Sequence, residues 1–412
     1  MDLYNKYLQY LKKNGNLRLT RKLIFDYPYT LLRQTYDHRT LRERGIFFTG
    51  SKIAKALIKK IGTINPEWKV YDPTAGAGDL IVNYAEKLPT KESVESTVEC
   101  WGRIIYATEI ESSFVPLIKL RLLLLAYYKV CGKIKLQDIN VRIARQQFAN
   151  IIAGDYVDFR FEVDVVMVNP PFNSMVLECR TEWGGGKVSN AAVILYSLEQ
   201  RYGNSIIAAI LPDVIRSGSR YSRLRNCLPR YLIDSEKSFG RFDKFTDVDV
   251  FLALGKRCHR KITPKTPTNR LPCIGDLFNV HVGNVVPHRD SQTGDLQYYL
   301  TARNVATGKV IRDFKDQIKS LHKSFGGPFV TIKRTSSPSD KFRCAASLID
   351  SRKSFFVENH LIVLKAKQTM SLTRYRKIMH YLIGDECTCF LNQTIRCRHL
   401  TVSIVKQIPI KE

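Results

Sequence analysis

From residue 68 onward, short runs of apolar residues alternate with longer stretches in which apolar residues recur at helical spacing. The runs predict strands at 68–71, 104–107, 151–152, 163–168 and 206–211. Apolar helical stretches separate several of these runs, notably 114–130 and 191–202. Continuous apolar strands joined by helices are typical of a parallel sheet covered on both faces. Such sheets bind ligands beyond the carboxyl ends of their strands, so we expect the chemistry to follow these runs.

The pattern changes on either side of this α/β stretch. Residues 1–43 are polar, with apolar residues near helical spacing, and predict a helical segment ahead of a domain at 44–255. Residues 256–272 are basic and contain three prolines, which is typical of a linker. Residues 273–412 mix strand-like runs with a helical stretch near 371–384, and predict a second domain of the α+β class.

Composition and charge then indicate a class of partner. The chain has 412 residues of which 44% are hydrophobic, enough to bury a core, and this excludes a disordered chain. Lys and Arg number 65 against 38 Asp and Glu, a net charge of +27. The C-terminal part 261–412 holds 25 basic and 11 acidic residues, so it is the more basic part per residue. So large a positive charge favours a nucleic acid as the partner.

Other classes of protein find little support. No apolar run approaches the roughly 20 residues needed to span a bilayer, and the first residues form no apolar signal core. We therefore expect no membrane partner and a cytoplasmic location. The ten cysteines are scattered and predict reduced thiols. Cys387, Cys389, Cys397 and His399 lie close in sequence without a common zinc spacing, so no metal is expected.

The first chemical motif directly follows the strand predicted at 68–71. It runs from Asp72 to Gly78 with the sequence Asp-Pro-Thr-Ala-Gly-Ala-Gly, and Asp79 follows it. Glycines let a ligand approach the backbone, and the turn leads into a helix N-terminus. Asp72 and Asp79 would repel phosphates and attract a ligand with an ammonium group. The motif therefore favours S-adenosylmethionine over a nucleotide di- or triphosphate.

Two more acidic residues follow later strands. Glu109 ends the second predicted strand, where a carboxylate can accept both hydroxyls of a ribose. Asp155 follows the third strand and could accept a hydrogen bond from an adenine amino group, with Asp138 as a competitor for that role. Both are expected at the same sheet edge as Asp72.

The most specific motif is Asn169-Pro170-Pro171-Phe172, which ends the fourth predicted strand. The prolines stiffen the turn and fix its carbonyls. The side-chain oxygen of Asn169 and the carbonyl of Pro170 can then accept from one nucleobase amine and localise its lone pair toward an incoming methyl group. Phe172 offers a stacking face for an extruded base.

On these motifs the chain resembles N6-adenine DNA methyltransferases of the gamma arrangement, over about residues 40–255. The resemblance implies a Rossmann-like S-adenosylmethionine-dependent methyltransferase domain with a mixed sheet, followed by an α+β target recognition domain. It assigns catalysis to Asn169, Pro170 and Phe172. The residues that it places around the cofactor are Phe48, Thr49, Asp72, Pro73, Ala75, Gly76, Gly78, Glu109 and Asp155. The family often has proline where this chain has Gly50, and Lys187 and Phe245 are further candidates for the base pocket.

The resemblance also implies a function and partners. We expect a monomer that methylates N6 of a flipped adenine in double-stranded DNA, either as an orphan enzyme or beside a restriction endonuclease that acts separately. The basic residues that we expect to contact DNA are Lys333, Arg334, Lys341, Arg343 and Arg374. Methylation of adenine in RNA or of N4 in cytosine uses similar chemistry and stays open. A protein glutamine methyltransferase or a DNA-binding subunit with a degenerate core is less favoured, because neither explains both the motifs and the charge.

Overall fold

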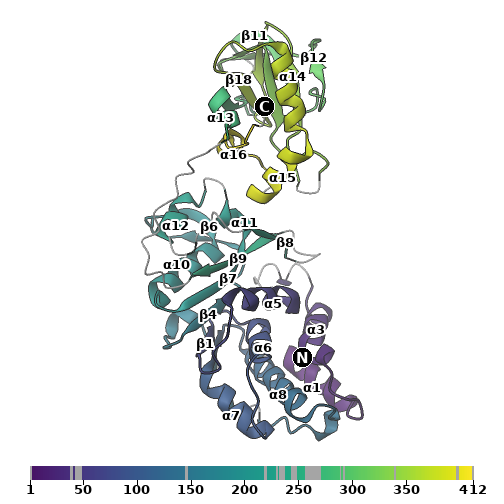
Figure 1. The fold of residues 1–412 in the computed structure, drawn as a ribbon, viewed down its shortest axis with the longest axis vertical. Helices are drawn as coiled ribbons and strands as arrows, with labels where there is room; N and C mark the ends of the chain where they lie inside the picture. Colours follow the sequence, from purple (N-terminus) through teal and green to yellow (C-terminus); the bar gives the residue numbers. More distant parts are fainter. Residues whose placement is uncertain are drawn as a thin grey trace. The chain divides into compact units, whose positions relative to one another are not determined.

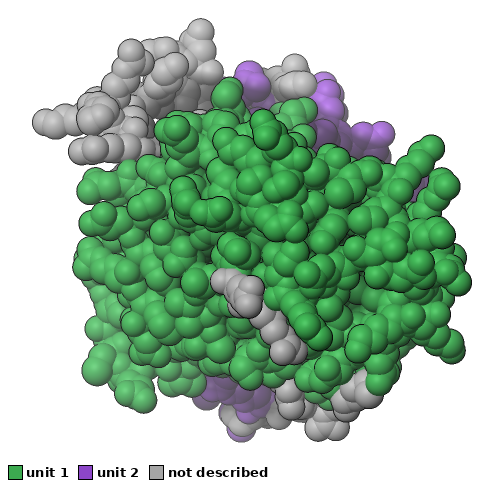
Figure 2. Space-filling view, turned by 90° about the horizontal axis from the view of Figure 1, so that it is seen from below, with its two compact units in different colours: residues 1–216, 223–262 green, residues 217–222, 263–412 purple. Residues whose placement is uncertain are grey.

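The computed structural model describes most of the chain and divides it into two compact units. The described residues are 2–37, 40–41, 49–143, 147–217, 220–228, 231, 237–242, 248–255, 271–287, 289–290, 293–337, 340–395 and 399–410. Unit 1 comprises residues 1–216 and 223–262, and unit 2 comprises 217–222 and 263–412. Figure 1 shows the elements of each unit, and Figure 2 colours the two units separately. Most of the expected linker lies outside the described residues.

Unit 1 is built on a seven-stranded sheet of order β3-β2-β1-β4-β7-β9-β8. The strands are β1 (Val70–Asp72), β2 (Ile105–Glu109), β3 (Ile151–Ala153), β4 (Val165–Val168), β7 (Ile206–Pro212), β8 (Ser238–Arg241) and β9 (Asp249–Gly255). The first five in this order pair in parallel, whereas β9 runs antiparallel to both β7 and β8. The expected α/β class with a mixed sheet is thereby confirmed.

Helices connect and cover these strands (Figure 1). They are α5 (Gly50–Ile61), α6 (Asp79–Ala85), α7 (Val94–Ile104), α8 (Val115–Cys131), α10 (Asn190–Tyr202), α11 (Asp213–Arg216) and α12 (Ser222–Cys227). Helix α8 is apolar around most of its circumference, and its central residues are buried. A two-stranded hairpin of β5 (Ser174–Leu177) and β6 (Gly186–Ser189) follows β4.

The N-terminal helices are α1 (Leu3–Lys13), α2 (Arg21–Phe25) and α3 (Tyr27–Thr35). Their apolar faces belong to the same hydrophobic core as the sheet, with Leu3 and Ile24 fully buried. Side chains cap the first two helices, because Asp2 accepts from the backbone of Asn5 and Thr20 from that of Leu23. These helices are therefore part of the packing of unit 1.

Unit 2 has two sheets and its own hydrophobic cores. A five-stranded sheet has the order β10-β18-β15-β16-β12, and a four-stranded sheet has the order β13-β11-β17-β14. Their strands are β10 (Phe278–Val282), β11 (Asp295–Leu300), β12 (Val310–Ile311), β13 (Gln317–Ser320), β14 (Phe325–Gly326), β15 (Phe329–Lys333), β16 (Ala346–Ile349), β17 (Ser354–Val357) and β18 (Leu361–Ala366). The helices are α13 (Ile274–Leu277), α14 (Leu372–Leu382), α15 (Asp385–Thr394) and α16 (Val402–Lys406). Their apolar faces share a core with the larger sheet.

Two kinds of feature are absent from the described residues. Among them no helix combines the length and the apolar character that a membrane crossing requires. Nor do three or more His, Cys, Asp and Glu side chains of this part of the chain gather where they could hold a metal ion. Cys397 lies outside the described residues.

Candidate active site

Three parallel strands bring the sequence motifs to one edge of the unit 1 sheet. Val70 of β1 pairs with Ile105 of β2 on one side and with Val165 of β4 on the other. Because the carboxyl ends of parallel strands meet at one edge, the residues after β1, β2 and β4 are neighbours. The loop after β1 therefore lies between Glu109 and Asn169.

Hydrogen bonds to β2 and to the end of β4 fix the loop after β1. The amide of Ala75 donates to the carbonyl oxygen of Thr108 (3.1 Å), and the Thr108 hydroxyl donates to the carbonyl of Pro73 (2.9 Å). On the other side, the Thr74 hydroxyl donates to the main-chain oxygen of Asn169 (3.3 Å). The expected cofactor loop and the expected catalytic residue are thus directly connected.

The carboxyl group of Asp72 is buried at the start of this loop. It is 1% exposed and accepts one hydrogen bond from the amide of Thr74 (3.2 Å). Burial raises the pKa of Asp72 well above its usual value, and the nearby charges of Glu109 and Asp79 raise this pKa further. A positive charge brought close to Asp72 would stabilise the ionised form.

Glu109 lies beside the same loop. Its two carboxyl oxygens accept from the amides of Gly76 (2.6 Å) and Glu111 (2.9 Å). Burial raises the pKa of Glu109, and these amides oppose the rise. The next residue, Ile110, is 77% exposed, so an apolar side chain stands in solvent beside two buried carboxyl groups. We had not singled out Ile110 from the sequence, because an isolated isoleucine gives no signal of exposure.

Two glycines of the loop adopt a backbone conformation that other residues rarely adopt. Both have positive φ, 54° at Gly76 and 86° at Gly78. A Cβ atom on Gly78 would lie 2.9 Å from Cγ2 of Ile118 in α8. Gly78 therefore allows a helix of this unit to approach the loop, whereas we had expected it to admit a ligand.

Asn169 is held at the end of β4. It is 9% exposed, and its Nδ2 donates to the hydroxyl oxygen of Thr49 (3.0 Å). Pro170 is buried and Pro171 half-buried, so the turn is packed on both sides of its first peptide bond. The amide of Asn169 is thereby tied to the start of α5, while its backbone is tied to the loop after β1.

An aromatic pair lies next to this turn. The rings of Phe172 and Phe242 meet edge to face, with centroids 5.0 Å apart. Phe242 was not predicted, because it follows β8, a strand far from Phe172 in sequence. Near them, a cavity of about 670 Å³ borders Thr49. Its lining includes the aromatic side chains of Phe25, Tyr29, Phe239 and Phe242. Phe48 and Phe245 lie outside the described residues, and Lys187 is exposed on β6.

The expectation that Asp79 faces the cofactor is wrong, because both oxygens of its carboxylate bind groups of the protein itself. One oxygen forms an ion pair with Arg121 (2.9 Å), and the other accepts from the amide of Gly50 (2.9 Å). Arg121 is fully buried and also donates to the carbonyls of Ile24 and Ala77. We missed Arg121, although a single arginine within the leucine-rich stretch 117–126 was a signal, since a buried charge needs a partner.

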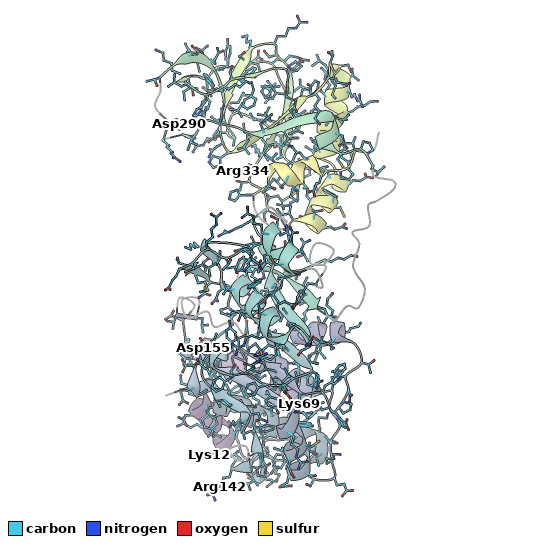
Figure 3. All side chains as sticks on the ribbon, turned by 90° about the vertical axis from the view of Figure 1, so that its left-hand side faces the viewer. Lys12, Lys69, Arg142, Asp155, Asp290 and Arg334 are labelled. Atoms are coloured by element: carbon cyan, nitrogen blue, oxygen red, sulfur yellow. The ribbon has the colours of Figure 1, made fainter. Side chains whose placement is uncertain are left out.

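Asp155 lies at the same sheet edge, beyond β3. The amide of Gly154 donates to the carbonyl of Glu109 (3.0 Å), which joins the ends of β2 and β3. The Asp155 side chain accepts from the amide of Val157 (3.2 Å) and is half-buried. Figure 3 labels Asp155 in unit 1. Its role toward an adenine stays a prediction.

The basic residues expected to contact DNA occupy different environments in unit 2. Arg343 is fully buried and donates to the carbonyls of Ser336 and Ile395, so the expectation that it contacts DNA is wrong. Lys341 and Arg374 are exposed, whereas Lys333 and Arg334, the latter labelled in Figure 3, are half-buried. For these four the DNA contact stays a prediction.

One family model matches part of the chain. Residues 22–185 match the family model of N-6 DNA methylase. This range includes the described motif residues from Thr49 to Phe172 and ends before β7. Among proteins with curated functions, none matches the chain in sequence.

Several solved structures are similar to the chain at low identity. A chain described as a modification subunit of a type I restriction enzyme from Vibrio vulnificus is 18% identical, with a TM-score of 0.38 over 57% of this chain and 49% of that one. The type IIG restriction endonuclease BpuSI is 13% identical, with a TM-score of 0.45 over 95% and 60% of the two chains. The type IIL restriction-modification enzyme MmeI in complex with DNA is 12% identical, with a TM-score of 0.47 over 98% and 70%.

The alignments thus span only 49% and 60% of the first two of these proteins. The family model supports the resemblance that the motifs predicted, while the gamma arrangement stays a prediction. Over residues 22–185 the chain is similar to the N-6 DNA methylase family.

Proposed function

We propose that this chain transfers a methyl group from S-adenosylmethionine to N6 of an adenine in double-stranded DNA. One observation carries the proposal. The turn Asn169-Pro170-Pro171-Phe172 is hydrogen-bonded through Thr74 to a glycine loop, at the sheet edge where β1 and β2 end in buried carboxyl groups. A site for an amine and a site for a cationic ligand therefore lie side by side.

The side chains around the loop fit S-adenosylmethionine. Burial raises the pKa values of Asp72 and Glu109 and so disfavours their ionised forms. A positively charged ligand bound nearby would stabilise these ionised forms. Glu109 retains lone pairs beyond those that accept backbone amides and can take the ribose hydroxyls. The exposed side chain of Ile110 offers an apolar surface for an adenine ring. When bound, S-adenosylmethionine supplies a methyl group attached to a positively charged sulfur.

The turn after β4 prepares the amine. The side-chain oxygen of Asn169 and the carbonyl of Pro170 accept its two hydrogens, which localises the nitrogen lone pair and stabilises the charge that develops there. Phe172, with Phe242 against its edge, provides the stacking face for the extruded base. These groups orient the amine, and no side chain acts as a nucleophile, so we expect no covalent enzyme intermediate.

Unit 2 and the net charge supply the contact with DNA. The most basic part of the chain, 261–412, lies almost wholly in this unit, and DNA phosphates are its natural counterions. The match of residues 22–185 to N-6 DNA methylase favours a role in DNA modification, which we propose takes place in the cytoplasm beside a separate endonuclease. We expect binding that weakens steeply as the salt concentration rises.

Expression in a host without DNA methylation tests this function. Direct sequencing of the host DNA should then show N6-methyladenine within one sequence motif. If N4-methylcytosine were found in place of N6-methyladenine, the chain would be a cytosine N4-methyltransferase. A host genome without any modified base, together with methylated adenine in RNA, would contradict it.

A further inference from the structure

The start of α5 departs from the usual way in which a helix begins. A threonine at the N-cap normally accepts a hydrogen bond from a backbone amide of its own helix. Thr49 occupies this position without such a bond. Its hydroxyl oxygen instead accepts from Nδ2 of Asn169 (3.0 Å), and the two side chains are 8% and 9% exposed.

A carboxylate from another helix supplies the missing cap. Asp79 opens α6, and its Oδ2 accepts from the amide of Gly50, the first residue of α5 (2.9 Å). Gly50 has a φ of 68°, which a proline cannot adopt, and a proline would also lack this amide hydrogen. The glycine that stands where the family often has proline therefore belongs to this arrangement.

A buried ion pair holds this external cap in place. Arg121 pairs with Oδ1 of Asp79 (2.9 Å) and is itself anchored by the carbonyls of Ile24 (3.0 Å) and Ala77 (2.5 Å). Because both charged groups are almost inaccessible to water, moving either one would leave the other unpaired. The position of Asp79, and with it the start of α5, is firmly defined.

Resting on the proposed function, we propose that Thr49 is a positioning residue that fixes the orientation of the Asn169 amide. An amide that turned over would present its NH₂ group to the substrate amine, where an acceptor is needed. The hydroxyl of Thr49 accepts from the NH₂ group, which orients the side-chain oxygen of Asn169 away from Thr49. Asp79 allows this because it takes over the capping of α5 from Thr49.

Three variants test the role of the hydroxyl. Thr49→Val removes it and keeps the shape, Thr49→Ser keeps it, and Thr63→Val makes the same change at an exposed threonine. We expect Thr49→Val to lower kcat about 10- to 100-fold, as loss of a positioning contact commonly does. In this role Thr49 acts through Asn169 and not on the cofactor, where the resemblance placed it, so the dissociation constant of S-adenosylmethionine, measured by calorimetry, should stay within about twofold. Thr49→Ser should restore most of kcat, and Thr63→Val should match the wild type.

Other results overturn the inference. A Thr49→Val protein with wild-type kcat, or one that binds S-adenosylmethionine tenfold more weakly at unchanged kcat, would show that the hydroxyl does not act through Asn169. The double variant with Asn169→Ala should be no slower than Asn169→Ala alone, and a further loss would also contradict the inference. The Tm of Thr49→Val and Thr49→Ser should agree, so that unfolding does not explain a loss of kcat.

The same assay separates this inference from the proposed function. If Asn169→Ala methylates DNA as well as the wild type does, or if the wild type does not methylate it, the proposed function fails and the inference fails with it. If Asn169→Ala is inactive while Thr49→Val is fully active, the inference fails alone.

Discussion

Two carboxylates at the two ends of α6 form ion pairs in opposite surroundings. Asp79 opens the helix, is 7% exposed and pairs with the fully buried Arg121. Glu86 is the C-cap and pairs with Arg21 and Lys55, whose side chains are 46% and 45% exposed. One helix thus carries a carboxylate with a buried cation and another, itself 14% exposed, whose cations are in contact with water.

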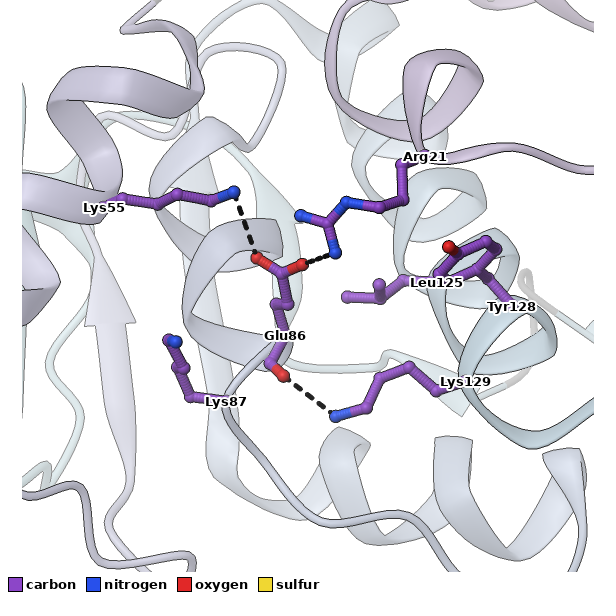
Figure 4. A pocket seen from close by; sticks show the side chains of 7 residues that line it. All are labelled: Arg21, Lys55, Glu86, Lys87, Leu125, Tyr128 and Lys129. Carbon is purple, nitrogen blue, oxygen red and sulfur yellow. Dashed lines mark hydrogen bonds and ion pairs between the residues drawn. The ribbon is translucent and has the colours of Figure 1, made fainter. Parts of the chain in front are cut away.

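The cations around Glu86 line an open cavity of about 420 Å³ (Figure 4). Lys129 donates to the main-chain carbonyl of Glu86 (2.9 Å), and Lys87 adds a further positive charge to the lining. Water competes for each of these partners, so the net gain from the pairs is small. The comparison teaches that the exclusion of water affects the strength of an ion pair more than the number of charged partners does. Asp79 with one cation holds the start of α5 in place, whereas Glu86 with several cations has no comparable effect on the candidate site.

The largest effect is expected from Arg121→Met, which leaves Asp79 buried without its cation. Loss of one partner of a buried pair costs about 3–5 kcal/mol of unfolding free energy. Urea denaturation of the variant measures this cost. The double variant with Asp79→Asn should recover part of it, since no unpaired charge then remains. Equal stability of wild type and Arg121→Met would show that the buried ion pair at the start of α6 contributes no more than the pairs of Glu86 at its end.

A second buried arginine extends the comparison to unit 2. Arg343 donates to Oγ and the carbonyl of Ser336 and to the carbonyl of Ile395, all inside that unit. Arg343→Met should lower the unfolding free energy by about 2–3 kcal/mol, because buried acceptors lose their donors. The exposed Lys341→Met is the matched control and should leave stability nearly unchanged. If Arg343→Met instead weakens DNA binding in a fully stable protein, our correction of its role is wrong.

The pH dependence of stability should reveal the cost of burying the Asp72 carboxylate. Burial first, and then the charges of Glu109 and Asp79, raise its pKa in the folded state above that of the unfolded chain. Its contribution to stability is therefore complete below the unfolded pKa of about 3.8 and is lost as the pH rises through the folded pKa. Without cofactor, Asp72→Asn should gain Tm over the wild type as the pH increases. Parallel Tm profiles of the two proteins would contradict this.

The smallest effect is expected from Glu86→Gln. Exposed ion pairs contribute about 0–1 kcal/mol, and salt screens them, so the variant should unfold within about 1 kcal/mol of the wild type. Denaturation at low and high salt should show that the remaining difference shrinks. A loss as large as that of Arg121→Met would show that exposure does not separate the two pairs.

The sequence predicted local features of unit 1 better than contacts between distant segments. Apolar runs predicted the positions of β1, β2, β3, β4 and β7, because a buried parallel strand must be apolar along its whole length. The motifs at Asp72 and Asn169 predicted the sheet edge at which chemistry is expected. Neither Phe242 nor the pairing of β9 with β7 could be predicted, since both depend on contacts between distant segments.

Individual polar side chains were the hardest to assign. Arg343 and Lys341 look alike in a basic sequence, yet one is buried and the other exposed. The resemblance placed Thr49 around the cofactor, and the partner of its hydroxyl in the structure lies 120 residues away. Sequence spacing reports local periodicity, whereas such contacts follow from tertiary packing.

One measurement tests the central claim most directly. Purified wild-type protein and Asn169→Ala are incubated with S-adenosylmethionine and unmethylated duplex DNA, and the digested nucleosides are identified by mass spectrometry. We predict N6-methyl-2′-deoxyadenosine with the wild type, and with Asn169→Ala a loss of at least about 100-fold while cofactor binding is retained. Equal methylation by both proteins, or no methylated adenine with the wild type, would contradict the account.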